Sequence, residues 1–352
     1  MIRSVIPFAE LKIDALLVSA LPNIRYLSGF TGDNGLLLVT PESQTLFTDP
    51  RFTIQASEEC ACAVKIAPRG PVDPYAVEAI QSRKLKRVGF EATRMIYDVH
   101  RRLKEAMPLG TSLKPIGPVI ENLRMVKTKD EIDRIRRSVQ TNSQAFEKTV
   151  QSIRPGVSES HIAAELEFQM RRLGAEKPAF ETIVASGPRS ALPHARPGNQ
   201  KTSVNELLLI DMGSCQDGYM SDMTRVLCFG KVTSRIRSMY DAVLKAQLAA
   251  IAAVREGVTA GHVDQKARQV LESEGLGKAF VHSTGHGLGL EIHEPPRVGR
   301  RDKTRLQAGM VITIEPGAYI QDFGGIRIED TVLVTKTGCE ILTPTSKELM
   351  VL

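Results

Sequence analysis

Residues Leu207 to Phe229 read LLLIDMGSCQDGYMSDMTRVLCF, and this stretch has the pattern of a β-hairpin. An apolar run leads to Asp211, the pair Asp217-Gly218 tolerates the positive φ of a tight turn, and a second β-compatible run carries Asp222. A two-residue loop at Asp217-Gly218 predicts that Asp211 faces Thr224. Asp211 and Asp222 would then be diagonal neighbours on one face of the ladder.

Two aspartates on one face have two explanations. Carboxylates at that range repel each other unless a positive charge lies between them, and a divalent metal ion would supply it. The alternative is a polar hairpin whose aspartates are simply solvated. The hairpin alone does not choose between these explanations, so the rest of the chain decides.

Length and composition are those of an ordinary globular protein. The chain has 352 residues, which is enough for two domains, because single cores seldom grow beyond roughly 250 to 300 residues. We expect a cytoplasmic protein with no membrane partner, since no apolar block resembles a signal peptide or reaches the ~20 residues of a membrane span. The cysteines lack CxxC spacing and predict neither a disulfide framework nor a structural zinc site: Cys60, Cys62, Cys215, Cys228 and Cys339.

The net charge of +6 raises the question of a nucleic-acid partner. Lysine and arginine are distributed among acidic residues along the predicted helices, and no block of five or more like charges occurs. The sequence also has no known nucleic-acid motif and no interleaving of basic and aromatic residues. We therefore expect no nucleic-acid partner.

The first third of the sequence alternates strand-like and helix-like segments. Between residues 14 and 118 this alternation predicts a modest α/β domain with a largely covered sheet. No glycine-rich phosphate loop follows its first strand, so a nucleotide site is not indicated. The pair Thr128 and Glu131 fits a capping box and marks a helix start, and we place the domain boundary just before it, giving domains of residues 1–120 and 121–352.

The second domain repeats one order of elements. Helices are expected over residues 129–153, 158–173, 234–256 and 261–274, and the strand-like segments FETIVASG, VITIEPGAYI and GIRIEDTVLVT accompany them. A helix pair followed by strands, occurring twice, predicts an α+β domain with two halves facing each other across a curved antiparallel sheet.

Further candidate ligands lie in the last quarter of the chain. His286 sits in HSTGHGLGLEIHE, where glycines leave little bulk around it, although a single loop histidine is usually only a polar loop residue. Glu315 ends an apolar strand, and a buried acid there needs a partner. Glu329 shares a strand face with Arg327 by period-two alternation, so the pair could instead be a simple ion pair.

The combined set favours metal-assisted hydrolysis. Four carboxylates and one imidazole suit Mn²⁺, Co²⁺ or Zn²⁺ better than a thiolate-preferring metal. Four carboxylates exceed what one ion needs, whereas two ions about 3.5 to 4 Å apart, sharing bridging carboxylates, would use them all.

The sequence resembles the dinuclear "pita-bread" metallopeptidases. The contexts that carry the resemblance are IDMGSCQDGYMSDMTR, HSTGHGLGLEIHE, TIEPGAY and GGIRIED, with YLSGFTG, LFTDPRF and RMVKTKDEI in the N-terminal part. Within that family the chain is most similar to the proline-specific branch, the Xaa-Pro dipeptidases (prolidases) and aminopeptidases P. The resemblance implies a C-terminal pita-bread domain preceded by a smaller creatinase-like α/β domain.

The resemblance also implies the metal ligands. Asp211 would bind one ion and His286 the other, with Glu315 completing the shell of the second. Asp222 and Glu329 would bridge the two ions. Mn²⁺ is the metal expected first, with Co²⁺ or Zn²⁺ as alternatives.

Other residues receive roles from the same resemblance. His194 and His293 would contact substrate and stabilise the developing oxyanion, and Glu315 would handle the proton. Arg297 would bind the free carboxylate of a dipeptide, although it could be an ordinary surface arginine. Thr224 and Arg327 would orient the carboxylate ligands.

The function expected first is hydrolysis of Xaa-Pro dipeptides, and the alternative is aminopeptidase P activity on longer Xaa-Pro-Yaa peptides. A methionine aminopeptidase would have the same five ligands. The additional N-terminal domain of roughly 120 residues, which is the size of a complete domain, argues against this class. A metal-free creatinase-type hydrolase and a non-catalytic pita-bread binding protein are disfavoured by the complete ligand set. The resemblance implies a homodimer in which the N-terminal domain covers the partner's cleft.

Overall fold

The computed structural model describes residues 6–352, and the chain divides into two compact units, Met1–Arg124 and Met125–Leu352. Each unit has its own apolar cores. Among the helices of residues 6–352, none is both long enough and apolar enough to cross a bilayer.

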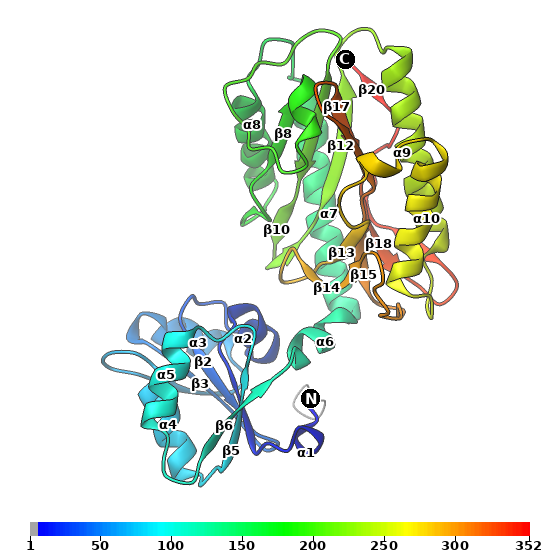
Figure 1. Cartoon of the computed structure of the whole chain (residues 1–352). Helices are drawn as coiled ribbons and strands as arrows, with labels where there is room; N and C mark the ends of the chain where they lie inside the picture. The colour runs from blue at the N-terminus through cyan, green and yellow to red at the C-terminus, as the bar shows by residue number, and fades with distance from the viewer. Residues whose placement is uncertain (1–5) are drawn as a thin grey trace. The chain divides into compact units, whose positions relative to one another are not determined.

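The first unit is built on one mixed six-stranded sheet with the order β4-β3-β2-β1-β5-β6 (Figure 1). The antiparallel meander β1-β2-β3 is extended by parallel pairs at both edges. The strands are β1 (Ala15–Val18), β2 (Leu36–Val39), β3 (Gln44–Thr48), β4 (Ala63–Ile66), β5 (Arg87–Glu91) and β6 (Ser112–Ile116). The helices are α1 (Phe8–Leu11), α2 (Leu21–Ser28), α3 (Thr53–Glu59), α4 (Asp73–Ser82), α5 (Tyr97–Ala106) and α6 (Val119–Met125).

Both faces of this sheet are covered, as the sequence predicts. Along β1, Leu16 and Val18 belong to the core that includes Ile24 of α2, whereas Leu17 belongs to the core that includes Leu103 of α5. Alternating side chains of one strand therefore enter two different cores.

The second unit contains two helix pairs: α7 (Lys129–Val150) with α8 (Glu159–Arg172), and α9 (Ser234–Ala253) with α10 (Ala260–Ser273). The predicted capping box at the start of α7 is confirmed, because Thr128 Oγ1 accepts from the Glu131 N–H and Glu131 Oε2 accepts from the Thr128 N–H at 2.8 Å. Figure 1 shows α8 on one side of the strands and the pair α9 and α10 on the other.

The strands of this unit form sheets with the orders β20-β12-β9-β8, β14-β13-β15-β18-β19, β11-β10-β7 and β16-β17. Neighbours are antiparallel except for β20, which runs parallel to β12. The bounds are β7 (Lys177–Pro178), β8 (Ile183–Ser186), β9 (Leu207–Met212), β10 (Ser214–Gln216), β11 (Tyr219–Met220), β12 (Met223–Cys228), β13 (Gly285–Gly287), β14 (Glu294–Val298), β15 (Val311–Ile314), β16 (Gly317–Ile320), β17 (Gly324–Arg327), β18 (Asp330–Val334), β19 (Cys339–Ile341) and β20 (Met350–Val351).

The central hairpin has the predicted register. Asp211 pairs with Thr224 across β9 and β12, and the turn residues Asp217 and Gly218 have φ values of 51° and 77°. Along β9, Leu208 and Ile210 pack in the core of α7 and α8, whereas alternate residues face the core of α9 and α10. The odd-numbered position of Asp211 therefore directs its carboxylate away from the α7 and α8 side.

The segment GIRIEDTVLVT differs from the predicted single strand. It forms β17, which pairs with β16, and β18, which pairs with β15, so that Glu329 lies between two strands of different sheets. The strand is interrupted because the backbone changes its hydrogen-bonding partner here. At this position the Glu329 N–H donates to the Thr224 carbonyl of β12 at 3.2 Å. The segment VITIEPGAYI divides in the same way at Glu315 and Pro316.

Candidate metal centre

The side chains predicted as metal ligands come from five separate places in the second unit. Asp211 lies on β9, Asp222 directly precedes β12, His286 lies on β13, Glu315 directly follows β15, and Glu329 lies between β17 and β18. All of them line one cavity of about 910 Å³. Four carboxyl groups and one imidazole thus meet in a single concave space.

Polar atoms of four of these residues lie close to one another. His286 Nε2 lies 3.6 Å from Asp222 Oδ2 and 3.4 Å from Glu315 Oε1. Ligand atoms of Asp222, His286 and Glu329 all lie within 4.8 Å of one another. Segments separated by more than 100 residues in sequence therefore contribute to one group of donors.

The environment of these carboxyl groups fits divalent cations. Asp211 Oδ1 and Glu329 Oε1 are buried and have no hydrogen-bond partner among the described residues. Burial raises the pKa of Asp222 and of Glu329 well above the usual range, and neighbouring carboxylates act in the same direction. Burial likewise raises the pKa of Glu315 to about 7. Such crowded, partly unpaired acids are stabilised in their charged form by a cation between them.

The surroundings of His286 favour the neutral form of its imidazole. Burial lowers its pKa, which favours the unprotonated imidazole that binds metals. Its Nδ1 lies 3.0 Å from the Gly287 carbonyl oxygen, so a proton on Nδ1 leaves the Nε2 lone pair facing the carboxylates.

Arg327 connects two of the candidate ligands. Its Nη2 donates to Asp211 Oδ2 at 2.6 Å, and its Nε donates to Thr224 Oγ1 at 3.0 Å. Thr224 Oγ1 in turn donates to Glu329 Oε2 at 2.7 Å. The other side of the guanidinium donates to the Tyr319 hydroxyl at 2.6 Å. Thr224 and Arg327, both singled out from the sequence, thus hold one oxygen of each acid and leave the other oxygen free.

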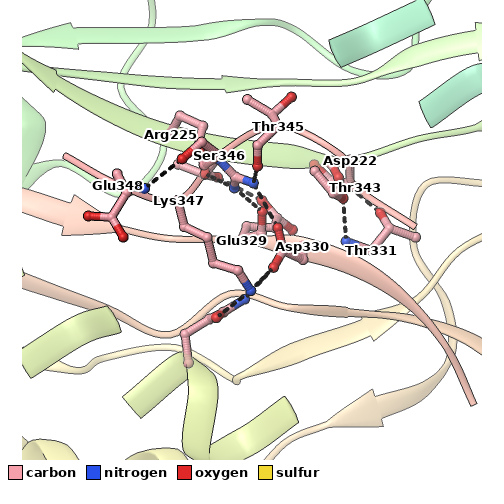
Figure 2. Close-up of polar contacts among 12 residues, drawn as sticks. Asp222, Arg225, Glu329, Asp330, Thr331, Thr343, Thr345, Ser346, Lys347 and Glu348 are labelled. Carbon is pink, nitrogen blue, oxygen red and sulfur yellow. Dashed lines mark hydrogen bonds and ion pairs between the residues drawn. The ribbon is translucent and has the colours of Figure 1, made fainter. Parts of the chain in front are cut away.

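A buried ion-pair network behind the ligands was not predicted from the sequence. Arg225 Nη2 donates to Asp330 Oδ1 at 2.8 Å, and Arg225 Nη1 donates to the Thr224 carbonyl at 2.9 Å and to the Glu329 carbonyl (Figure 2). The other Asp330 oxygen accepts from Lys347 Nζ and from Gln247 Nε2. Through Arg225 this network connects the backbone at Thr224 with the backbone at Glu329.

Thr331 extends the same support to Asp222. Its hydroxyl donates to the Asp222 carbonyl at 2.9 Å, and its N–H donates to Thr343 Oγ1 at 3.0 Å (Figure 2).

One sequence signal could have indicated the network of Arg225 and Asp330. Arg225 follows Thr224 and Asp330 follows Glu329, and each is a charged residue within an apolar strand.

The predicted substrate-contacting residues line the same cavity. His194, His293 and Arg297 are exposed side chains on its wall. The His293 ring packs edge-on against His286, with 4.4 Å between ring centroids, and partial shielding of the ring from water lowers the pKa of His293. Arg297 lies on β14, where it pairs with His286 of β13.

His282 and Glu294 are further residues of this wall that the sequence argument did not use. His282 Nε2 lies 2.8 Å from the Tyr319 hydroxyl, and burial lowers the pKa of His282 to about 4. Glu294, which follows His293 in the sequence, forms a buried ion pair with Lys127 at 3.2 Å. Both contacts restrict segments that carry cavity residues.

Comparison with known proteins supplies an independent result. The sequence matches metallopeptidase family M24 over residues 133–336 and the creatinase/prolidase N-terminal domain over residues 7–126. It is 38% identical to an Xaa-Pro dipeptidase of Pyrococcus horikoshii over 351 residues, which cover 99% of this chain and 98% of that protein.

Solved structures with this fold carry both activity names. An Xaa-Pro dipeptidase from Bacillus anthracis has 36% identity and a TM-score of 0.96, covering 99% of this chain and 98% of that one. An X-Pro aminopeptidase from Thermotoga maritima has 36% identity and a TM-score of 0.92, covering 98% and 99%. The predicted α+β pita-bread class with its creatinase-like N-terminal domain is confirmed, and the chain belongs to metallopeptidase family M24.

Proposed function

We propose that this metallopeptidase hydrolyses the bond before proline in Xaa-Pro dipeptides. The observation that carries the proposal is the convergence of four acids and one imidazole on one cavity, where two buried carboxylate oxygens lack partners. Relatives named Xaa-Pro dipeptidase that align over nearly the whole chain support the choice of substrate.

Two divalent ions are the proposed cofactors. Asp211 would hold one ion, Asp222 and Glu329 would be shared, and His286 and Glu315 would hold the other. The donors are oxygens and one imidazole nitrogen, which suit Mn²⁺ first and Co²⁺ or Zn²⁺ as alternatives. When bound, such ions act as Lewis acids on a carbonyl and lower the pKa of water.

The side chains of the cavity would manage the proton and the substrate. Glu315 is proposed to accept the proton of the attacking water and to return it to the proline nitrogen, because a secondary amine must be protonated as it leaves. His194 and His293 would donate hydrogen bonds to the oxygen on which charge develops. Both lie on the cavity wall near the candidate ligands.

Arg297 is proposed to bind the free carboxylate of a dipeptide substrate. Its guanidinium is exposed on the cavity wall and offers the fork geometry that a carboxylate accepts. One observation favours the second candidate function, aminopeptidase P activity on Xaa-Pro-Yaa peptides. A second cavity shares Arg297 with the first, and it offers space for a residue that follows a proline bound at Arg297.

The experiment compares hydrolysis of Ala-Pro and Ala-Pro-Gly by the purified protein with added Mn²⁺, Co²⁺ or Zn²⁺. Cleavage of Ala-Pro supports the dipeptidase proposal, and cleavage of the tripeptide alone would overturn it in favour of aminopeptidase P. A non-catalytic binding protein would bind no metal and would cleave neither peptide. Metal analysis of the same samples therefore tests that alternative.

We further propose domain limits of 1–120 and 121–352, a cytoplasmic location and a homodimer. Sedimentation equilibrium tests the dimer, and the mass of a single chain at micromolar concentration would contradict it. Limited proteolysis tests the domain limits, because a linker between domains is cut before the domains themselves.

A further inference from the structure

A second cavity of about 420 Å³ adjoins the candidate active site. Its wall includes His282, Ser283, Arg297 and Asp302, which also line the first cavity. The two cavities therefore share part of their walls, and Arg297 belongs to both.

The wall of the second cavity is strongly basic. Arg300 and Arg301 are exposed on it, and neither forms an ion pair with an acid among residues 6–352. Arg268 also lines it, but its charge is balanced by Asp264, whose Oδ2 accepts from Arg268 Nε at 2.7 Å. The positive charge available to a ligand is thus that of Arg297 on β14 and of Arg300 and Arg301 in the loop that follows this strand.

One acid also lines the cavity, and its carboxylate is partly occupied. Asp302 Oδ1 accepts from the Thr304 N–H at 2.7 Å. Asp302 offsets one of three positive charges, from Arg297, Arg300 and Arg301, so a net positive charge remains.

The loop that carries these arginines is held in place by the start of α10. The Gly261 N–H donates to the Asp302 carbonyl at 3.0 Å, and the Ala260 N–H donates to the Thr304 carbonyl at 2.9 Å. A Cβ on Gly261 would lie 2.7 Å from the Asp302 oxygen, which shows how closely the two segments approach. A fixed backbone reduces the entropy lost when the arginines bind a ligand.

We propose that this second cavity is an anion subsite that selects peptides with an acidic residue directly after the proline. The inference rests on the second candidate function, cleavage of Xaa-Pro-Yaa peptides, with the proline bound next to Arg297. A chain that continues past the proline then enters the second cavity, where Arg300 and Arg301 meet the side-chain carboxylate. Guanidinium groups bind carboxylates through charge-assisted, frequently bidentate hydrogen bonds.

The test compares Ala-Pro-Glu with Ala-Pro-Gln, both amidated at the C-terminus so that a side chain carries the only carboxylate. The two peptides differ in charge but hardly in shape. The purified chain with added Mn²⁺ is assayed for kcat/KM on both peptides and on Ala-Pro. The same assay is applied to the double variant Arg300→Gln/Arg301→Gln and to Lys303→Gln. Lys303 is the matched control, because it is an exposed cation of the same loop that does not belong to the cavity wall. Taking the ratio of the two tripeptides within each protein removes any general loss of folded enzyme.

We expect kcat/KM for Ala-Pro-Glu to exceed that for Ala-Pro-Gln about tenfold, as one charge-assisted contact provides. The ratio should fall to about one in the double variant and remain about tenfold in the Lys303 variant. Equal rates in the unmodified enzyme, or a ratio that survives in the double variant, would overturn the subsite. Cleavage of Ala-Pro with neither tripeptide cleaved would also overturn it and leave the dipeptidase proposal standing. Failure on all three peptides would overturn the proposed function itself.

Discussion

Arg327 Nη2 lies 2.6 Å from Asp211 Oδ2, and both side chains are buried in the wall of the candidate active site. The guanidinium occupies one oxygen of Asp211, and the other oxygen has no partner among the described residues. Asp211 is therefore oriented by Arg327 while keeping one oxygen for a cation.

Replacing Arg327 by methionine should weaken metal binding. Because outer partners orient ligands, we expect the affinity for Mn²⁺ to fall roughly 10- to 100-fold. Competition with a chelator of known affinity measures this change. Arg305→Met serves as the control, since Arg305 is exposed and bonds the Gly257 carbonyl at 2.8 Å instead of a candidate ligand. An unchanged Mn²⁺ affinity in Arg327→Met would contradict the orienting role.

Asp330→Asn should destabilise the protein even without metal. Asp330 is fully buried between Arg225 and Lys347, and the substitution leaves both cations without a counter-charge. We expect a loss of about 3–5 kcal/mol in the free energy of unfolding, measured by urea denaturation of the chelated protein.

Glu340→Gln provides the comparison for this experiment. Glu340 accepts from Arg136 at 2.7 Å, but both side chains are partly exposed to water, so breaking this pair should cost only about 0–1 kcal/mol. Equal losses in the Asp330 and Glu340 variants would show that the buried network does not support the fold.

His282 should make the stability of the chelated protein depend on pH. Burial lowers its pKa to about 4, and the nearby cations Arg327 and Arg268 act in the same direction. The unfolded chain therefore binds a proton near pH 6.5 that the folded chain takes up only near pH 4, so stability should fall as pH decreases through this window. The contribution of His282 to this loss in the free energy of unfolding should reach about 3 kcal/mol.

His282→Gln isolates that contribution. Unfolding free energies of the two proteins are measured in urea at pH 7 and at pH 4, and the pH-dependent loss should be smaller in the variant by the amount assigned to His282. Parallel pH profiles for both proteins would contradict a buried, neutral His282.

The hairpin and the helix starts could be predicted because their determinants are local. The positive φ of Asp217 and Gly218 defines a two-residue turn, and this turn fixes the pairing of Asp211 with Thr224. Likewise, Thr128 and Glu131 lie three residues apart and cap α7 by contacts within one turn.

The support behind the ligands could not be predicted in this way. Arg225 and Asp330 are separated by 105 residues, and nothing in either local sequence identifies the other as a partner. The division of GIRIEDTVLVT also depends on residues distant in sequence, because β17 pairs with β16 in one sheet and β18 pairs with β15 in another. Local alternation predicted that Arg327 and Glu329 share one strand face, and both line one cavity, but it did not predict the change of sheet between them.

The number of ions bound per chain shows whether the candidate site is a dinuclear metal centre. The purified protein is saturated with Mn²⁺, freed of excess metal, and analysed for bound ions and for hydrolysis of Ala-Pro, alongside Asp222→Ala and a chelated sample. We predict two ions per chain with activity in the unmodified protein, at most one ion without activity in the variant, and no activity after chelation. A metal-free protein that cleaves Ala-Pro at the full rate would contradict the account.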